Sequence, residues 1–254
     1  KLETKAGTLC RGLGYSEIIT YSFVSPAVFD QIRLPADSPL RNAMRIQNPL
    51  GEDTSIMRTI ALPSMLEILS RNNAYHNKSV KLYELAKIYL PVEGQALPEE
   101  PRMLLLGTYG AGETFFTLKG ELEAIFKGLR VKKASYCAVK DNPSYHPGRC
   151  AKVSIDGVDV GVMGQVHPLV ARNYGIEGEV YCAEINFTKL FGLQLPDATY
   201  VPLPKYPTVT RDLSLICDEE ITVAQAEAVI TAAAGKLLRG VKLFDIYRGT
   251  GVPE

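Results

Sequence analysis

The sequence lacks a net charge, because 28 lysine and arginine residues are balanced by 28 aspartate and glutamate residues over 254 positions. A chain with this balance has no long-range field that would draw it onto phosphate or an anionic membrane surface. It also lacks a long apolar run, since Met103–Leu106 is far shorter than the roughly 20 residues of a membrane-spanning helix. We therefore expect no membrane partner, and any contact with nucleic acid must be local.

Cysteine is sparse and follows no ligand pattern. The five cysteines are widely spaced, with no C-x-x-C pair and no histidine at the spacing of a zinc site. This pattern is typical of reduced thiols and argues against disulfides or a bound metal. We expect a cytoplasmic protein without a metal site.

The signatures of common phosphate-binding and nucleophilic chemistries are also missing. Neither G-x-x-x-x-G-K-[ST] nor G-x-G-x-x-G occurs, and no G-x-S-x-G elbow is present. Two of the three histidines, His146 and His167, precede proline and have no acidic partner in their own segments. Histidines in such turns are more often structural than general bases.

Residues 1–198 are predicted to form one domain in which strands outnumber helices. The turn Asp156-Gly157 between two β-prone runs predicts a hairpin over Val153–Met163. The irregular order of elements favours an antiparallel α+β domain over a doubly wound sheet. The periodicity predicts helices at Lys5–Leu13, Pro63–Asn72, Gly120–Leu129 and Pro168–Asn173, and strands at Glu17–Val24, Val80–Tyr89, Met103–Tyr109 and Glu179–Ile185.

Residues 199–254 follow a different pattern after the proline-rich segment Tyr200–Tyr206. Leu213–Cys217 and Val241–Tyr247 are predicted strands on either side of an alanine-rich helix, Thr222–Ala234. Thr222 is its expected N-cap and Gly235 its stop. This β-α-β unit is half of a ferredoxin-like module, so one strand edge is left uncovered and we expect the natural protein to continue.

Six groups of residues form a pattern along the chain: Gly12–Phe23; Asn48–Leu50 with Met57–Thr59 and Leu62–Pro63; Leu118–Glu123; His146–Arg149; Gly164–Pro168; and Tyr206–Ser214. In this order they resemble the beta subunit of bacterial phenylalanyl-tRNA synthetase, and the resemblance covers nearly the whole chain. Residues up to about 196 resemble its catalytic-like module, and the remainder resembles the first half of its ferredoxin-fold anticodon-binding module.

The resemblance implies a class II aminoacyl-tRNA synthetase fold, an antiparallel sheet with flanking helices, that has lost its chemistry. Class II enzymes clamp the phosphates of ATP with arginines in motifs 2 and 3. In the matching segments, Leu90 stands at the motif 2 arginine, and Glu184, Asn186 and Lys189 stand at the glycines and the arginine of motif 3. Lysine does not reproduce the bidentate guanidinium fork. We therefore expect no catalytic residue here and no cofactor, ATP and magnesium being used by the partner alpha subunit.

The resemblance also implies partners. The family's enzyme is an alpha2-beta2 heterotetramer that attaches phenylalanine to tRNA(Phe), and its motif 1 helix and strand form the subunit interface. The matching residues Leu9, Leu13, Tyr15 and Ile18 either face the alpha subunit or lie in the core. In the C-terminal part, Arg211, Lys242 and Arg248 either reach tRNA phosphates or are solvated surface charges.

The leading hypothesis is a non-catalytic, structural and tRNA-positioning part of phenylalanine-tRNA ligase. One alternative is an active amino-acid-activating ligase with a displaced set of arginines. Another is a stand-alone class II synthetase-like paralogue with a tRNA-binding or regulatory role, against which the zero net charge argues.

Overall fold

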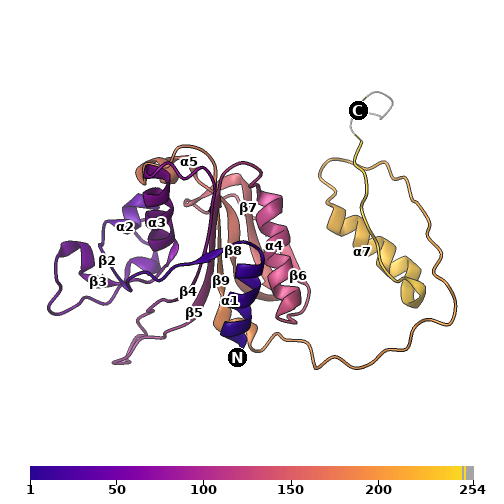
Figure 1. The fold of residues 1–254 in the computed structure, drawn as a ribbon, viewed down its shortest axis with the longest axis horizontal. Helices are drawn as coiled ribbons and strands as arrows, with labels where there is room; N and C mark the ends of the chain where they lie inside the picture. The colour runs from indigo at the N-terminus through magenta and orange to yellow at the C-terminus, as the bar shows by residue number, and fades with distance from the viewer. Residues whose placement is uncertain (248, 250–254) are drawn as a thin grey trace. The chain divides into compact units, whose positions relative to one another are not determined.

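The structure is a computed structural model that describes residues 1–247 and 249 (Figure 1). The chain separates into two compact units, Lys1–Asp197 (unit 1) and Ala198–Glu254 (unit 2). Across the described residues, no helix combines the length and the apolar character needed to cross a membrane.

Unit 1 is built on a seven-stranded sheet with the strand order β1-β4-β5-β9-β8-β7-β6. The prediction of an antiparallel sheet is wrong at one edge, because β1 runs parallel to β4 and the sheet is mixed. A parallel pair needs a long crossover, and residues 18–79 supply it. The strands are β1 (Ser16–Glu17), β4 (Val80–Lys87), β5 (Arg102–Tyr109), β6 (Ala134–Ala138), β7 (Tyr145–Ile155), β8 (Val158–Val166) and β9 (Val180–Asn186).

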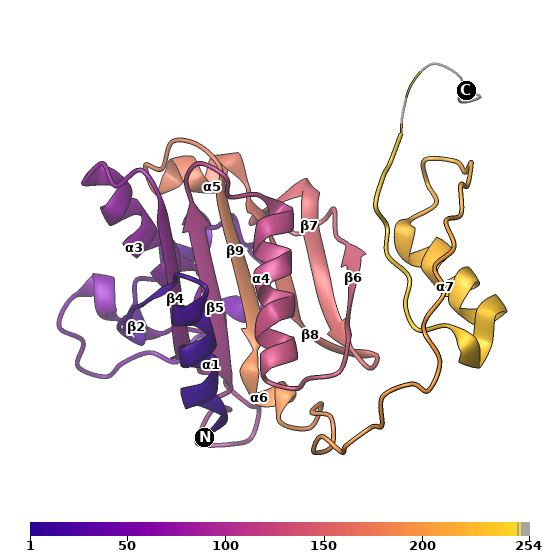
Figure 2. The same cartoon turned by 45° about the vertical axis from the view of Figure 1, so that its right-hand side comes forward.

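Helices cover both faces of this sheet. Helices α1 and α4 lie side by side on one face (Figure 2), while α3 and α5 pack on the other. The sheet thereby divides the core into two clusters, because successive side chains of a strand point to opposite faces. Leu106 and Ile185 belong to the α1/α4 cluster, whereas Leu105 and Cys182 belong to the α3/α5 cluster. The helices are α1 (Leu2–Gly12), α3 (Leu62–Ala74), α4 (Phe115–Gly128) and α5 (Pro168–Asn173).

Close packing of α3 on the sheet depends on one glycine. A Cβ atom added at Gly107 would lie 2.6 Å from Sδ of Met65 and 3.0 Å from Cδ1 of Leu69. Helix α3 therefore approaches β5 at a distance that a larger residue at position 107 would prevent.

Most elements of unit 1 agree with the periodicity of the sequence, including the hairpin between β7 and β8. Its turn residues Asp156 and Gly157 have φ angles of 53° and 78°, as a tight two-residue hairpin turn requires. The single strand predicted at Glu17–Val24 is wrong. It divides between β1 and β2 (Phe23–Val24), and β2 pairs with β3 (Ile56–Met57) in a separate two-stranded sheet.

The division has a local cause. The backbone N–H of Ile18 still donates to the carbonyl of Tyr83 on β4 at 2.9 Å, whereas that of Thr20 donates to the Glu84 side chain at 3.0 Å. The Glu84 side chain thus accepts the hydrogen bond that a backbone carbonyl of β4 would accept in a continued strand pair. The pairing with β4 therefore ends before Thr20.

Unit 2 contains helix α7 (Val223–Ala234), which confirms the predicted helix. The Thr222 side chain accepts from the Gln225 N–H, Gln225 bonds back to Thr222, and Gly235 ends the helix at φ 57°. No strand occurs in the described part of unit 2, so the strands predicted at Leu213–Cys217 and Val241–Tyr247 are wrong for this structure. A strand needs a hydrogen-bonded neighbour, and in a split β-α-β arrangement that neighbour is a further strand.

Candidate functional site

A row of cross-strand neighbours runs over the α3 face of the sheet: Glu84, Leu105, Glu184, Val162 and Lys152, on β4, β5, β9, β8 and β7. Directly opposite residues of a sheet point to the same side. The row therefore places two glutamates and a lysine on the face that carries the positions expected to have lost their synthetase chemistry.

Glu184 is the buried member of these positions, at 6% exposure. The Tyr145 hydroxyl donates to its carboxylate at 3.1 Å, and the backbone N–H of Leu62, at the start of α3, also bonds to it. Burial raises the pKa of Glu184 from 4.5 to about 7, and the two hydrogen bonds offset only part of that rise. A carboxyl held there is a core group whose hydrogen bonds are made within unit 1.

Asn186 and Lys189 both have structural partners. Asn186 is the N-cap of α6 (Phe187–Leu190), and its Oδ1 accepts from the Lys189 N–H at 3.1 Å. The Lys189 Nζ donates to the carbonyl of Asp159 at 2.8 Å. These residues therefore hold α6 against β8.

Asn186 and Lys189 also line a pocket of about 410 Å³ on this face. Lys152 also lines it and forms an ion pair with Asp159 at 3.1 Å, and the Ser154 hydroxyl donates to the same carboxylate at 2.6 Å. The Ser154 hydrogen bond, together with Lys152, lowers the pKa of Asp159. Among the described residues that line the pocket, none is an arginine. Both lysines are already engaged, so the pocket lacks a guanidinium fork for a nucleotide.

Leu90 lies apart from this pocket. Its backbone exchanges two hydrogen bonds of 2.9 Å with Glu99, and its side chain packs against the α3/α5 cluster. The structure thus brings Glu184, Asn186 and Lys189 together at the end of β9 and gives Leu90 a packing role.

The four residues considered for a subunit interface have partners inside unit 1. Tyr15 is 3% exposed, and its hydroxyl donates to Glu121 at 2.5 Å. The Leu9 side chain lies against α4, since a Cβ at Gly128 would be 2.6 Å from it. Leu13 and Ile18 are partly buried against the two core clusters. Their placement favours the core alternative.

The exposed apolar side chains lie further along the same segment. Ile19, Tyr21 and Phe23 are 92%, 79% and 42% exposed and occur at every second position. We call residues 18–24 the edge segment, because it follows β1, the outermost strand of the large sheet. Three exposed apolar side chains at alternate positions of one short segment are typical of a protein-docking surface.

A buried ion pair, Arg58–Glu84, is hydrogen-bonded to the edge segment. Arg58 and Glu84 are 2% and 5% exposed at their side chains and lie 3.4 Å apart. Arg58 Nη1 donates to the Thr20 hydroxyl at 2.6 Å, and its backbone N–H donates to the carbonyl of Ser22 at 2.9 Å. Thr20 in turn donates through its backbone N–H and its hydroxyl to Glu84. Sequence reasoning missed this network, although Arg58 lies within the quoted segment Met57–Thr59.

The residues considered for tRNA contact are only partly described. Arg211 and Lys242 are exposed in unit 2, and Arg211 donates to the carbonyl of its neighbour Thr210. Arg248 lies outside the described residues. Their role stays a prediction.

The fold of unit 1 is similar to that of class II aminoacyl-tRNA synthetases. The pyrrolysyl-tRNA synthetase of Desulfitobacterium hafniense superposes with a TM-score of 0.62 at 13% sequence identity, over 76% of this chain and 69% of that one. A second structure of the enzyme from this organism gives a TM-score of 0.59. These likenesses define the class of fold.

Sequence comparison defines the family. Residues 1–187 match the model of the phenylalanyl-tRNA synthetase beta chain CLM domain, and residues 204–254 match that of the ferredoxin-fold anticodon binding domain. The chain is 42% identical over its whole length to the phenylalanine–tRNA ligase beta subunit of Clostridium tetani, covering 32% of it. It is 44% identical over 95% of its length to that of Clostridium acetobutylicum, covering 30%. The chain therefore belongs to the phenylalanyl-tRNA synthetase beta chain family and spans about a third of the length of these relatives.

Proposed function

We propose that this chain is a non-catalytic, structural and tRNA-positioning part of phenylalanine-tRNA ligase. It supports the ATP-dependent attachment of phenylalanine to tRNA(Phe) by an alpha subunit in the cytoplasm, within an alpha2-beta2 assembly. ATP and magnesium are used by the alpha subunit and not by this chain.

The observation that carries the non-catalytic role is that the residues expected at the glycine and arginine positions of motif 3 already have structural partners. Glu184 is buried beneath α3, Asn186 caps α6, and Lys189 bonds to a backbone carbonyl of β8. Loss of one preorganised donor to a developing charge costs about 3 kcal/mol in the transition state. Two clamping arginines are replaced here, by Leu90 and Lys189.

The edge segment supports a role in subunit assembly. Burying Ile19, Tyr21 and Phe23 against a partner would remove apolar surface from water, which is the main source of affinity at the centre of an interface. The Arg58–Glu84 pair keeps this segment in place before binding, so less conformational entropy is lost on association.

Residues 199–254 are proposed as the N-terminal half of a ferredoxin-fold anticodon-binding module. The match of residues 204–254 and the capped helix α7 support this assignment. Arg211 and Lys242 are its candidate phosphate contacts, because both are exposed cations. Binding of tRNA(Phe) by the assembly should weaken with salt, and removal of either cation should lower that salt dependence by about one phosphate contact.

Co-purification tests the assembly role. A complete beta subunit carrying these residues should co-purify with its alpha subunit, and the double substitution Ile19→Ser, Tyr21→Ser should abolish or strongly weaken the complex. Phe116→Ser is the matched control, because Phe116 is 78% exposed on α4, outside the edge segment. Equal recovery of alpha with both variants would contradict docking at the edge segment.

Exchange of pyrophosphate into ATP separates this proposal from an active ligase. The chain alone, supplied with phenylalanine, ATP and magnesium, should give no exchange above background. Exchange by the chain itself would establish a displaced catalytic set and refute the non-catalytic role.

A further inference from the structure

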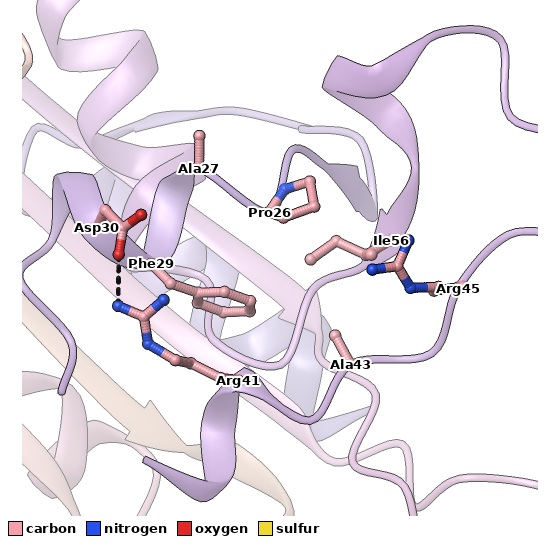
Figure 3. A pocket seen from close by; sticks show the side chains of 8 residues that line it. All are labelled: Pro26, Ala27, Phe29, Asp30, Arg41, Ala43, Arg45 and Ile56. Atoms are coloured by element: carbon pink, nitrogen blue, oxygen red, sulfur yellow. Dashed lines mark hydrogen bonds and ion pairs between the residues drawn. The ribbon is translucent and has the colours of Figure 1, made fainter. Parts of the chain in front are cut away.

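A second pocket, of about 310 Å³, lies outside the seven-stranded sheet (Figure 3). It opens between α2 (Val28–Gln31), the short 3-10 turn at Pro39–Arg41 and strand β3. Five of its eight lining residues are apolar: Pro26, Ala27, Phe29, Ala43 and Ile56. The volume is at the lower end of the range for small-ligand sites.

Arg41 is fixed on one side of this pocket. Its Nε donates to the carbonyl of Pro35 at 2.8 Å, and its Nη2 donates to Leu34 and, at 2.6 Å, to Asp30. The guanidinium carbon lies 5.8 Å from the centre of the Phe29 ring. Asp30 therefore neutralises Arg41, and only Nη1 has no bonded partner among the described residues.

Arg45 lies beside Ile56 and lines the same pocket (Figure 3). Its backbone bridges to Ile56 in antiparallel register, which brings both side chains to one face. The Arg45 side chain forms no hydrogen bond or ion pair within the described part of the chain, and it is exposed. Of the three charged groups at the rim, Arg45 is thus the uncompensated one, and the local charge is +1.

The charge and shape of the pocket select among anions. A planar carboxylate carries one charge and matches the two parallel donors of a guanidinium fork. A phosphate dianion is less suited, because the Asp30 carboxylate lies on the same rim and repels a second negative charge. The apolar lining favours an apolar group attached to the anion, chiefly through Pro26, Ala27 and Ala43, because Phe29 and Ile56 are already almost fully buried.

We propose that this pocket binds a small organic acid, with the carboxylate on Arg45 and an apolar group against Pro26, Ala27 and Ala43. The site is independent of the function proposed above and of the edge segment. Exposed arginine loses side-chain entropy on binding, so we expect a weak dissociation constant, on the order of 1 mM.

Titration of the whole chain with phenylacetate, followed by amide chemical shifts, tests this site. Saturable shifts should centre on residues 26–30, 41–45 and 56. Phenylacetamide, which lacks only the charge, and acetate, which lacks only the ring, should each bind at least about 10-fold more weakly. Absence of saturation by phenylacetate, or equal binding of phenylacetamide, would overturn the proposal.

Three variants sharpen the test. Arg45→Gln should weaken phenylacetate binding about 10-fold or more, whereas Asp30→Asn should strengthen it because it frees Arg41 and raises the local charge to +2. Arg71→Gln is the control: it removes an exposed arginine of α3, whose Nη2 lies 3.8 Å from Glu67 Oε1 and which does not line the pocket. Unchanged affinity in Arg45→Gln would refute the assignment. Inorganic phosphate binding as tightly as phenylacetate would replace it with a general anion site.

Discussion

Replacing Glu184 by glutamine should make unit 1 more stable at pH 8 than the parent chain while changing its stability little at pH 5. The folded state raises the pKa of this carboxyl from 4.5 to about 7, chiefly because the group is buried. Between these values the folded state binds a proton that the unfolded state releases. Stability from this group is therefore complete below pH 4.5 and is lost as the pH rises through 7.

The magnitude follows from the same two values. The interval from 4.5 to about 7 corresponds to about 3 kcal/mol, of which about 2.5 kcal/mol falls between pH 5 and pH 8. Glutamine keeps an oxygen for the Tyr145 hydroxyl and never ionises, so its stability lacks this component.

Urea unfolding followed by far-ultraviolet circular dichroism measures the effect at pH 5, 6, 7 and 8; the chain has no tryptophan to report by fluorescence. The difference between the Glu184→Gln and parent free energies cancels the titration of the three histidines. It should grow by about 2.5 kcal/mol from pH 5 to pH 8 in favour of the variant. A difference that stays flat, or that grows in favour of the parent, would refute the argument that burial dominates this site.

Three further substitutions probe the scaffold. Thr20→Val removes a hydroxyl that is bonded to two buried charges, so it should lower the free energy of unfolding in urea by about 2 kcal/mol. A loss below about 0.5 kcal/mol would mean that Arg58 and Glu84 do not depend on this hydroxyl. Gly107→Ala should lower the free energy of unfolding by about 1–3 kcal/mol, because the added Cβ meets Met65. Gly120→Ala is the control on α4, where the added Cβ meets open space, and it should be neutral or stabilising. Equal effects of the two substitutions would contradict the close contact of α3 with the sheet. Thr222→Ala removes the N-cap of α7 and should lower the stability of that helix by about 1 kcal/mol. The loss should be visible as reduced helical Cα chemical shifts at residues 223–234. Unchanged shifts would show that the cap is dispensable.

The parts of the fold that follow from local pattern were predictable. Helix α7 has a cap, an alanine-rich body and a glycine stop, and the β7–β8 turn has residues that tolerate positive φ. Strand β6 was missed because Ala134–Ala138 is a half-exposed edge strand without a clear apolar alternation. The parallel pairing of β1 with β4 joins residues about 65 positions apart, which no local pattern encodes.

For the candidate site, the sequence predicts which residues occupy the motif positions but not the contacts that these residues make. The resemblance predicts that Leu90 and Lys189 stand at arginine positions of the class II motifs and that Glu184 and Asn186 stand at glycine positions. The structure places Glu184, Asn186 and Lys189 at or just after the end of β9. Their partners come from elsewhere in the chain: Tyr145 and Leu62 for Glu184, and Asp159 for Lys189. Such contacts follow from tertiary packing, as does the Arg58–Glu84 pair, whose members are 26 positions apart.

The start of helix α3 connects the altered face of the sheet with the edge segment. The backbone N–H of Leu62 bonds to Glu184, and the Ser64 hydroxyl accepts from Arg58 at 3.3 Å. The two glutamates that these bonds reach, Glu184 directly and Glu84 through Arg58, flank Leu105 in one row of the sheet. A nucleotide-binding site at the centre of this row would need an exposed, positively charged surface. Helix α3 instead covers this part of the sheet. The helix that closes the face also contacts Arg58, which supports Thr20, so the closed face and the position of the edge segment have the same structural basis.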